Sequence, residues 1–469
     1  MILDMLKEHK KREAASFHMP GHKNGNGFLG TALESHLFSF DTTELCDTDA
    51  LIQPSGAILE AEQRAASLYG ARHSFYLVNG STGGILAMLY AAFSAGDMVL
   101  VDRNCHQSVL HGCMLLGLQP VYITPRASRL PGLPGVLVAE DVQSALNEYP
   151  AAKGLIIASP TYYGEVADLC AISKVLHKHG ALLLVDEAHG AHFPFSELFP
   201  KTAMEQGADL SVTSLHKTMS APNQTALLHM SDTFEINGVR KAVNMFQTSS
   251  PSYLLLAAME QALCFGAEQG AAKTEEILKS LSKIDCPRLD DPFKLLPNFN
   301  YEDLSSADAD KIFREKFGIY AEMTTPCGLL LMVSWCNTQA DLDLLQKALD
   351  YCNGASKGME LSPTPYAPQK MLNKSLVPLC DLKKISTEEV PFDAAKGRIC
   401  ASPVSAFPPC VPILLPGERI GTEEIEQLHQ LKMQGATITG GGEKVSVLCE
   451  SRAKKCKKIV ENKLTYQKN

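Results

Sequence analysis

The stretch SVTSLHKT, residues 211–218, decides the fold, because a β-prone run there ends in a lysine flanked by hydroxyl groups and a histidine. Val, Thr and Leu favour a strand. Open α/β sheets bind their ligands at the carboxyl ends of such strands. A solvated lysine that merely follows a strand is the structural alternative. Other parts of the chain must therefore decide whether Lys217 is functional.

An unbroken apolar run upstream ends in an aspartate. Residues 180–190, GALLLVDEAHG, are typical of a strand that is buried on both faces and leads to Asp186. A carboxylate at that position is costly to bury unless it meets a cation or a strong donor. Proteins hold pyridoxal phosphate (PLP) with a Schiff-base lysine and with an aspartate that faces the pyridinium nitrogen. The combination of Lys217 and Asp186 therefore favours PLP as the cofactor.

The composition is that of a globular protein with two or three domains: 469 residues, 45% hydrophobic and 20% charged. The 14 cysteines form no CxxC pair, and we find neither a signal peptide nor an apolar stretch of membrane-spanning length. We therefore expect a cytoplasmic protein without disulfides. The net charge of −9 gives no general attraction for nucleic acid, although the tail at residues 452–469 is basic.

A second motif, NGSTGG at residues 79–84, lies between a predicted strand and an apolar helix that extends to Phe93. This order places free backbone amides, the helix dipole and the hydroxyls of Ser81 and Thr82 where a phosphate binds. A simple capped turn is the alternative. Helix-length segments separate most of the predicted strands, as a βαβ sheet requires. These strands are at residues 74–78, 98–101, 121–124, 155–159 and 225–230, together with the apolar run that leads to Asp186 and the β-prone run that precedes Lys217.

Two histidine pairs raise a metal site as the rival chemistry. His18 and His22 are four residues apart, but the Pro and Gly between them break the helix that such a pair requires. His189 and His192 follow the aspartate of the apolar run with irregular spacing. The acidic stretch at 41–49 lacks the spacing of a calcium loop. We therefore expect no metal.

The second half of the chain is predicted to form smaller units. Helical patterns at 307–317 and 338–351 flank a strand at 329–333, and a segment rich in Gly, Ser and Pro follows. The expected organisation is an N-terminal arm at 1–15, a large PLP-binding domain at 16–272, a small α/β domain at 273–353, a linker at 354–370 and a C-terminal domain at 371–469.

These motifs resemble those of the group III Orn/Lys/Arg PLP-dependent decarboxylases of bacteria over nearly the whole chain. In family order they are FHMPGHKNG, NGSTGG, RNCHQS, SPTYYG, VDEAHGAH, SLHKT, QTSSPSY, GIYAEM and PPCVPILLPGE. The length is similar to that of the short Gram-positive type, without the receiver-like N-terminal wing of the longer enzymes. The resemblance implies a fold type I, aspartate aminotransferase-like large domain with a mostly parallel seven-stranded sheet, plus smaller α+β C-terminal domains. It also implies a homodimer or a dimer of dimers with shared active sites.

The resemblance implies a role for each site residue. Lys217 matches the lysine bonded to the cofactor, Asp186 the partner of the pyridine nitrogen, and His106 the histidine that stacks on the ring. Glu322 matches the carboxylate that receives the distal cation of the substrate. The other cofactor-side positions are Ser81, Thr82, His189, Ser214, His216, Thr248 and Ser249, the last two in a turn that reaches the site from the neighbouring subunit.

Two departures from the family leave the substrate open. The chain has FPPC at 407–410 where the family usually has YPPG, and His189 where the longer enzymes resemble one another in having tryptophan. The implied reaction is decarboxylation of a basic amino acid to CO2 and a polyamine-type amine. Arginine ranks before lysine and ornithine, because a guanidinium can bind a carboxylate through two parallel hydrogen bonds. Lys217 and His216 are both candidates to reprotonate the carbon.

Two other functions remain as alternatives. One is a different fold type I PLP reaction, catalysed by an aminotransferase or a lyase, for which Arg398 is a candidate to bind the substrate α-carboxylate. The second is a non-catalytic relative that binds PLP or a polyamine. The presence of both Lys217 and Asp186 argues against this second alternative.

Overall fold

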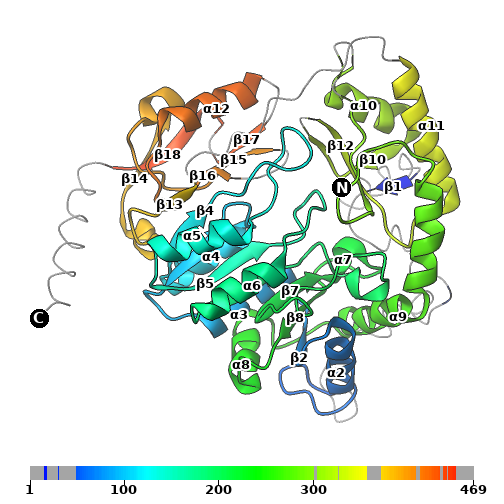
Figure 1. Ribbon diagram of the computed structural model, residues 1–469, viewed down its shortest axis with the longest axis horizontal. Helices are drawn as coiled ribbons and strands as arrows, with labels where there is room; N and C mark the ends of the chain where they lie inside the picture. The colour runs from blue at the N-terminus through cyan, green and yellow to red at the C-terminus, as the bar shows by residue number, and fades with distance from the viewer. Residues whose placement is uncertain are drawn as a thin grey trace, which may run out of the picture.

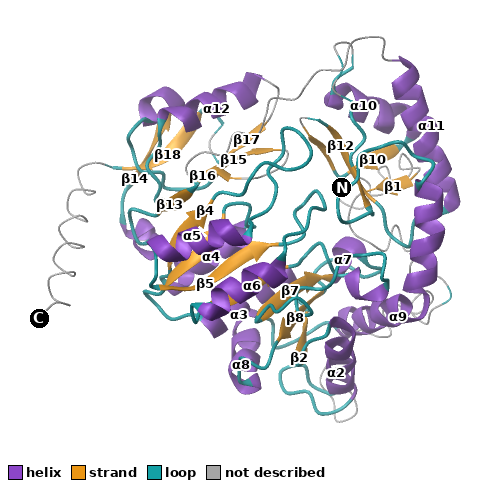
Figure 2. Ribbon diagram, in the orientation of Figure 1, coloured by secondary structure: helices purple, strands orange, loops and turns teal. Residues whose placement is uncertain are grey.

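An eight-stranded sheet forms the centre of the computed structural model (Figures 1 and 2), with strand order β13-β4-β3-β5-β6-β7-β8-β2. The structure describes residues 15–17, 30, 49–299, 301, 304–325, 327–355, 371–407, 412–433, 437–440 and 442–449. The strands are β2 (His73–Leu77), β3 (Met98–Asp102), β4 (Gln119–Ile123), β5 (Ala152–Ala158), β6 (Leu182–Asp186), β7 (Leu210–Ser214), β8 (Ala226–Met230) and β13 (Leu372–Lys374).

The strands of the sheet run mostly parallel. β3 pairs in parallel with β4 and β5, β5 pairs with β6, and β6 pairs with β7. β8 is antiparallel to both β7 and β2. The seven expected strands are therefore present, and an eighth, β13, joins them from beyond the expected linker by pairing antiparallel with β4. The carboxyl ends of β3 to β7 consequently meet at one edge of the sheet.

Alternating side chains of these strands face two layers of helices. In β3, Val99 and Val101 lie in one apolar cluster with residues of α3 (Gly80–Ala92), α4 (Gln107–Leu116) and α8 (Ile236–Phe246). Leu100 lies in another cluster, with residues of α5 (Ala139–Glu148) and α6 (Leu169–Lys178). Helices thus cover both faces, which explains why the strands read as continuous apolar runs.

A long helix, α9 (Tyr253–Leu281), connects the sheet to the next unit. The expected domain boundary at residue 272 lies inside this helix, because Thr274, Ile277 and Leu281 continue its buried face. A Cβ on Gly270 would lie 2.8 Å from Phe195 Cβ and 3.2 Å from Trp335 Cζ2, so the helix packs closely between both parts of the chain. The large sheet and the following unit therefore share one core cluster.

The unit after α9 contains a three-stranded antiparallel sheet, β11-β12-β9. Its elements are β9 (Lys294–Leu295), β11 (Met323–Thr325) and β12 (Gly328–Met332), with α10 (Ser306–Phe317) and α11 (Gln339–Ala355). A two-stranded pair beside it joins β10 (Ile319–Ala321) to β1 (Ala15–Phe17) in parallel. α2 (Ala57–Tyr69) contacts α9 and contributes to the shared core.

The C-terminal segment, orange in Figure 1, packs beside β4 and has a core of its own. Its elements are β13, β14 (Thr387–Pro391), β15 (Val404–Phe407), β16 (Pro412–Leu414), α12 (Thr422–Met433), β17 (Thr437–Thr439) and β18 (Lys444–Leu448), with short 3-10 helices at Leu379–Lys384 and Phe392–Ala395. They form the sheets β14-β18 and β16-β15-β17.

Several sequence predictions lie outside the described residues: residues 1–14 of the arm, His18, His22, residues 408–410 of the FPPC departure and the basic tail at 452–469. Among the helices that the structure does describe, none is both long and apolar enough to cross a membrane.

Candidate active site

The candidate site lies at the carboxyl edge of the central sheet. Lys217 is on α7 (Leu215–Thr218), one turn of helix that follows β7 directly. Asp186 is the last residue of β6 and is 7% exposed. His106 begins α4 just after β3, and the loop that starts at Ser159 follows β5. The parallel pairing of these strands brings their loops together, as the sequence predicts.

Lys217, which is half-buried, contacts a buried histidine. Lys217 Nζ lies 3.1 Å from His189 Nε2, and on the other side of the ring Lys294 Nζ lies 3.0 Å from His189 Nδ1. His189 is 6% exposed and Lys294 is 1% exposed. A single imidazole therefore bridges two lysines that are 77 residues apart in the sequence.

Burial lowers the pKa of Lys217, Lys294 and His189, which favours the neutral form of each group. Desolvation lowers the pKa of Lys217, while the charges of Asp186 and Glu322 oppose that shift. Desolvation also lowers the pKa of Lys294 to about 8 and lowers the pKa of His189 well below its usual value. A lysine with a lowered pKa is available as a free amine, which a nucleophilic lysine requires.

Glu322 lies in the same site, although it comes from the small unit. The hydroxyl of Tyr162 donates a hydrogen bond to Glu322 Oε1. The Tyr162 ring lies 4.5 Å from the His189 ring, centroid to centroid, and Lys294 Nζ lies 5.7 Å from the Tyr162 centroid. Glu322 therefore faces both lysines, and its charge acts on the pKa of each.

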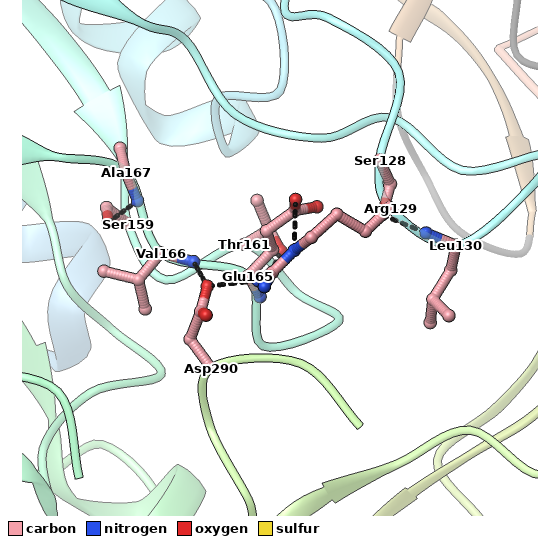
Figure 3. Close-up of polar contacts among 9 residues, drawn as sticks. All are labelled: Ser128, Arg129, Leu130, Ser159, Thr161, Glu165, Val166, Ala167 and Asp290. Carbon is pink, nitrogen blue, oxygen red and sulfur yellow. Dashed lines mark hydrogen bonds and ion pairs between the residues drawn. The ribbon is translucent and has the colours of Figure 1, made fainter. Parts of the chain in front are cut away.

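Polar contacts fix the loop that follows β5, which includes Tyr162 (Figure 3). Arg129 Nε donates to Glu165 Oε1 at 3.2 Å, and its Nη2 donates to Asp290 Oδ2. The same Asp290 oxygen accepts from the Val166 amide at 2.8 Å. These contacts join the loop after β5 to the segment that leads into Lys294.

Asp186 and His106 lie near Lys217 at the ends of β6 and β3. Asp186 Oδ1 accepts a hydrogen bond from the Ala188 amide at 3.2 Å. The charge of Asp186 acts on the pKa of both Lys217 and His106, so the three groups face a common space. His106 is exposed, and its Nδ1 lies 2.7 Å from Ser108 Oγ, which fixes the ring at the start of α4.

The predicted phosphate cradle is at the start of α3, which includes Ser81 and Thr82. The amides of a helix's first turn have no partner within the helix and favour an anion. A Cβ on Gly84 would lie 2.6 Å from Leu77 Cδ1, so only glycine allows the helix to start this close to the sheet. Across the site, Ser214 Oγ lies 3.1 Å from His216 Nδ1.

Thr248 and Ser249 are exposed, and they follow a residue that contacts the start of α3. The Asn79 side chain donates to the Phe246 carbonyl at 2.9 Å, two residues before Thr248. The Thr248 hydroxyl accepts from the Ser250 amide at 3.1 Å, which shapes the turn.

The residues of the two alternative assignments, a metal site and an α-carboxylate site at Arg398, have other contacts in the structure. Within the described residues, no group of three or more His, Cys, Asp or Glu side chains is arranged to hold a metal ion. His192 Nε2 instead lies 3.2 Å from Asp291 Oδ1 in a fully buried pair. Arg398 is bound within the C-terminal segment, where it donates to Glu388 and to the Leu448 carbonyl.

Comparison with known proteins identifies the family. The model of the Orn/Lys/Arg decarboxylase major domain matches residues 2–291, and the model of the Orn/Lys/Arg decarboxylase C-terminal domain matches residues 377–439. The chain belongs to the Orn/Lys/Arg decarboxylase family. Its members are PLP-dependent amino-acid decarboxylases that act on basic amino acids, and this chain is one of these enzymes.

Relatives of the family match nearly the whole chain. An arginine decarboxylase of Bacillus subtilis is 32% identical over 93% of this chain and 94% of its own length. The uncharacterized protein YaaO of the same organism is 33% identical over 93% and 95%. The solved structure of lysine decarboxylase A from Pseudomonas aeruginosa covers 95% of this chain and 79% of its own, with a TM-score of 0.74 at 19% identity. That likeness confirms the fold type I architecture.

The residues present fit the PLP of the family. A phosphate fits the amides and hydroxyls at the start of α3, a pyridinium fits the Asp186 carboxylate, and an aldehyde fits the amine of Lys217. Two residues of the site were missed by the sequence analysis: Tyr162, which the SPTYYG motif contains, and Lys294. A lysine inside the apolar run at 292–296, PFKLL, was the available signal for Lys294.

Proposed function

We propose that this enzyme decarboxylates arginine in preference to lysine and ornithine. The observation that carries the proposal is Glu322, a carboxylate held by Tyr162 beside Lys217. A partly buried carboxylate binds a guanidinium through two parallel, charge-assisted hydrogen bonds, which a lysine or ornithine ammonium cannot reproduce. The relatives of similar length that are named arginine decarboxylase support the same substrate.

The proposal assigns a residue to each chemical step of the decarboxylation. Bound PLP supplies a sink for the electrons that remain when CO2 leaves. The Asp186 carboxylate holds a positive charge on the ring nitrogen, because an opposite charge at close range raises the pKa of that nitrogen. His106 packs against the ring, and Lys217 is the amine that binds the cofactor. Lys217 or His216 returns a proton to the substrate carbon.

The remaining cofactor contacts follow from position. We propose that Ser81, Thr82, Ser214 and His216 bind the phosphate side. Thr248 and Ser249, which are exposed in the single chain, would complete the site of a second subunit in a cytoplasmic homodimer or dimer of dimers. Sedimentation of the PLP-loaded enzyme tests the dimer.

The experiment is to measure CO2 release by the PLP-loaded enzyme from arginine, lysine and ornithine in turn. The Glu322→Gln variant should raise KM for arginine about ten- to hundredfold, because a hydrogen bond to a charged group contributes roughly 1.5–3 kcal/mol. Glu315→Gln, which changes an exposed glutamate on α10, is the matched control and should leave KM unchanged. CO2 release from lysine alone, or equal KM values in the two variants, would refute the substrate assignment.

A further inference from the structure

The bridge formed by Lys217, His189 and Lys294 restricts where protons can lie. A neutral imidazole has one N–H donor and one acceptor nitrogen, whereas a lysine ammonium can only donate. Both contacts of His189 are at hydrogen-bond distance, 3.1 Å to Lys217 and 3.0 Å to Lys294. With a neutral imidazole, both hydrogen bonds form only when at least one lysine is a free amine, because the ring N–H needs an acceptor that an ammonium cannot supply.

The alternative, an imidazolium that donates to two free amines, is disfavoured here. Burial and the two neighbouring lysines lower the pKa of His189 well below its usual value, and His216 and His106 act in the same direction. His189 is therefore the neutral member, and Lys217 and Lys294 together hold at most one ammonium proton while both hydrogen bonds stand.

We propose that Lys294 is a positioning residue that, through His189, shares this proton with Lys217 and so keeps Lys217 available as a free amine. In one arrangement Lys217 is the ammonium and donates to His189 Nε2, while His189 Nδ1–H donates to the free amine of Lys294. Moving one proton from Lys217 to Nε2, and another from Nδ1 to Lys294, gives the mirror arrangement. No charge enters or leaves the site, and Lys217 gains the lone pair that it needs to bond to an aldehyde carbon.

The surroundings of Lys294 hold it in place for this exchange. Its stem packs against Gly164, where an added Cβ would lie 2.8 Å from Lys294 Cγ. Its amide donates to the Asp291 carbonyl at 3.1 Å, and the Asp291 amide donates to the Gly164 carbonyl at 2.9 Å.

The charges that face Lys294 offset only part of the effect of its burial on the pKa. Those of Asp291 and Glu322 favour the ammonium, whereas that of Lys217 opposes it. Lys217 faces Asp186 and the same Glu322. Each lysine therefore has carboxylates that stabilise the ammonium, and each loses part of that stabilisation when the other lysine is charged.

The inference rests on the proposed role of Lys217, but its test does not require activity. The full-length chain is freed of PLP by dialysis against hydroxylamine and labelled with trace acetic anhydride across a range of pH. Peptide mass spectrometry then gives the acylation of Lys217 and Lys294 separately, with the exposed Lys153 as the internal reference. Two lysines that share a proton titrate as a pair, so both profiles should rise in the same two steps.

Two variants separate the shared proton from a merely structural role. Lys294→Met removes the second amine, so the neighbouring carboxylates stabilise only the Lys217 ammonium and the pKa of Lys217 should rise. At a pH below that pKa, acylation of Lys217 should fall about tenfold for each unit of the rise, and its profile should show a single step. Lys294→Arg keeps a cation that cannot lose its proton, so Lys217 should stay as reactive as in the wild type, also in a single step.

Three results would overturn the proposal: independent single-step profiles in the wild type, an unchanged Lys217 profile in a folded Lys294→Met protein, or an equal loss in both folded variants. The wild-type measurement stands alone if a variant does not fold. Adding PLP before labelling tests the proposed function separately, since PLP protects Lys217 from acylation only if Lys217 binds the cofactor.

Discussion

Replacing Glu418 with alanine should loosen the attachment of the C-terminal segment to the large sheet. Glu418 is 2% exposed, and its partner Arg103, just after β3, is 7% exposed. Both guanidinium ends of Arg103 donate to the Glu418 carboxylate, with Nη2 at 2.8 Å from Oε2. Asn373 in β13 and the Leu415 amide also donate to this carboxylate, at 2.7 and 2.9 Å. One carboxylate thus joins three segments of the chain.

The magnitude follows from the burial of this pair. Removing one partner of a buried ion pair costs about 3–5 kcal/mol, because it leaves an uncompensated charge. At about 1.4 kcal/mol for each factor of ten, the open form of the C-terminal segment should become roughly 140- to 3,700-fold more populated. Replacing both residues, as in Arg103→Met with Glu418→Met, removes both charges and should recover most of the loss.

Hydrogen exchange read by mass spectrometry tests this prediction, because it measures opening of β13, β15 and β16 separately from β6. Glu443→Ala is the control, since it removes a glutamate of the same segment that is paired with Lys432 at the surface, where ion pairs contribute little. Exchange in Glu418→Ala that is no faster than in Glu443→Ala would refute the reasoning. So would a double variant whose loss equals the sum of the two single losses.

Two buried groups predict opposite pH dependences of stability. Desolvation lowers the pKa of His229 from 6.5 to about 3, so the fold should lose up to about 5 kcal/mol as the pH falls from 6.5 towards 3. His229→Gln should flatten that part of the melting-temperature profile, and an unchanged slope would contradict the prediction. Desolvation raises the pKa of Asp102 from 3.8 to about 7, so stability should fall by roughly 4 kcal/mol as the pH rises through this window. Asp102→Asn should remove this loss and melt higher than the wild type above pH 7, and a lower melting temperature there would show that the carboxylate is needed.

The central sheet was predictable because its signals are local. β6 is an apolar run that ends in Asp186, and the β-prone run of β7 ends three residues before Lys217. Strand order then places both residues at the same edge without further information. β13 was not predictable in this way, because its three residues carry neither an apolar run nor an alternating pattern.

The sequence alone did not predict the contacts between segments that are distant in the chain. Lys294 lies 105 residues from His189, and Arg103 lies 315 residues from Glu418. Arg103 and Glu418 look like ordinary surface charges until the fold shows their burial. Glu322 was assigned only through the family resemblance, and the structure then supplied its contact with Tyr162.

The C-terminal segment also contacts the turn that leads from β3 to His106. Arg103, which Glu418 holds, is three residues before His106. The turn between them is short, because the Cys105 amide donates to the Asp102 carbonyl at 3.0 Å and the Val109 amide donates to the His106 carbonyl at 2.9 Å. A displacement of Arg103 therefore has little loop to absorb it before it reaches His106. Loss of the Glu418 contact should thus weaken PLP binding in a chain whose central sheet is still folded.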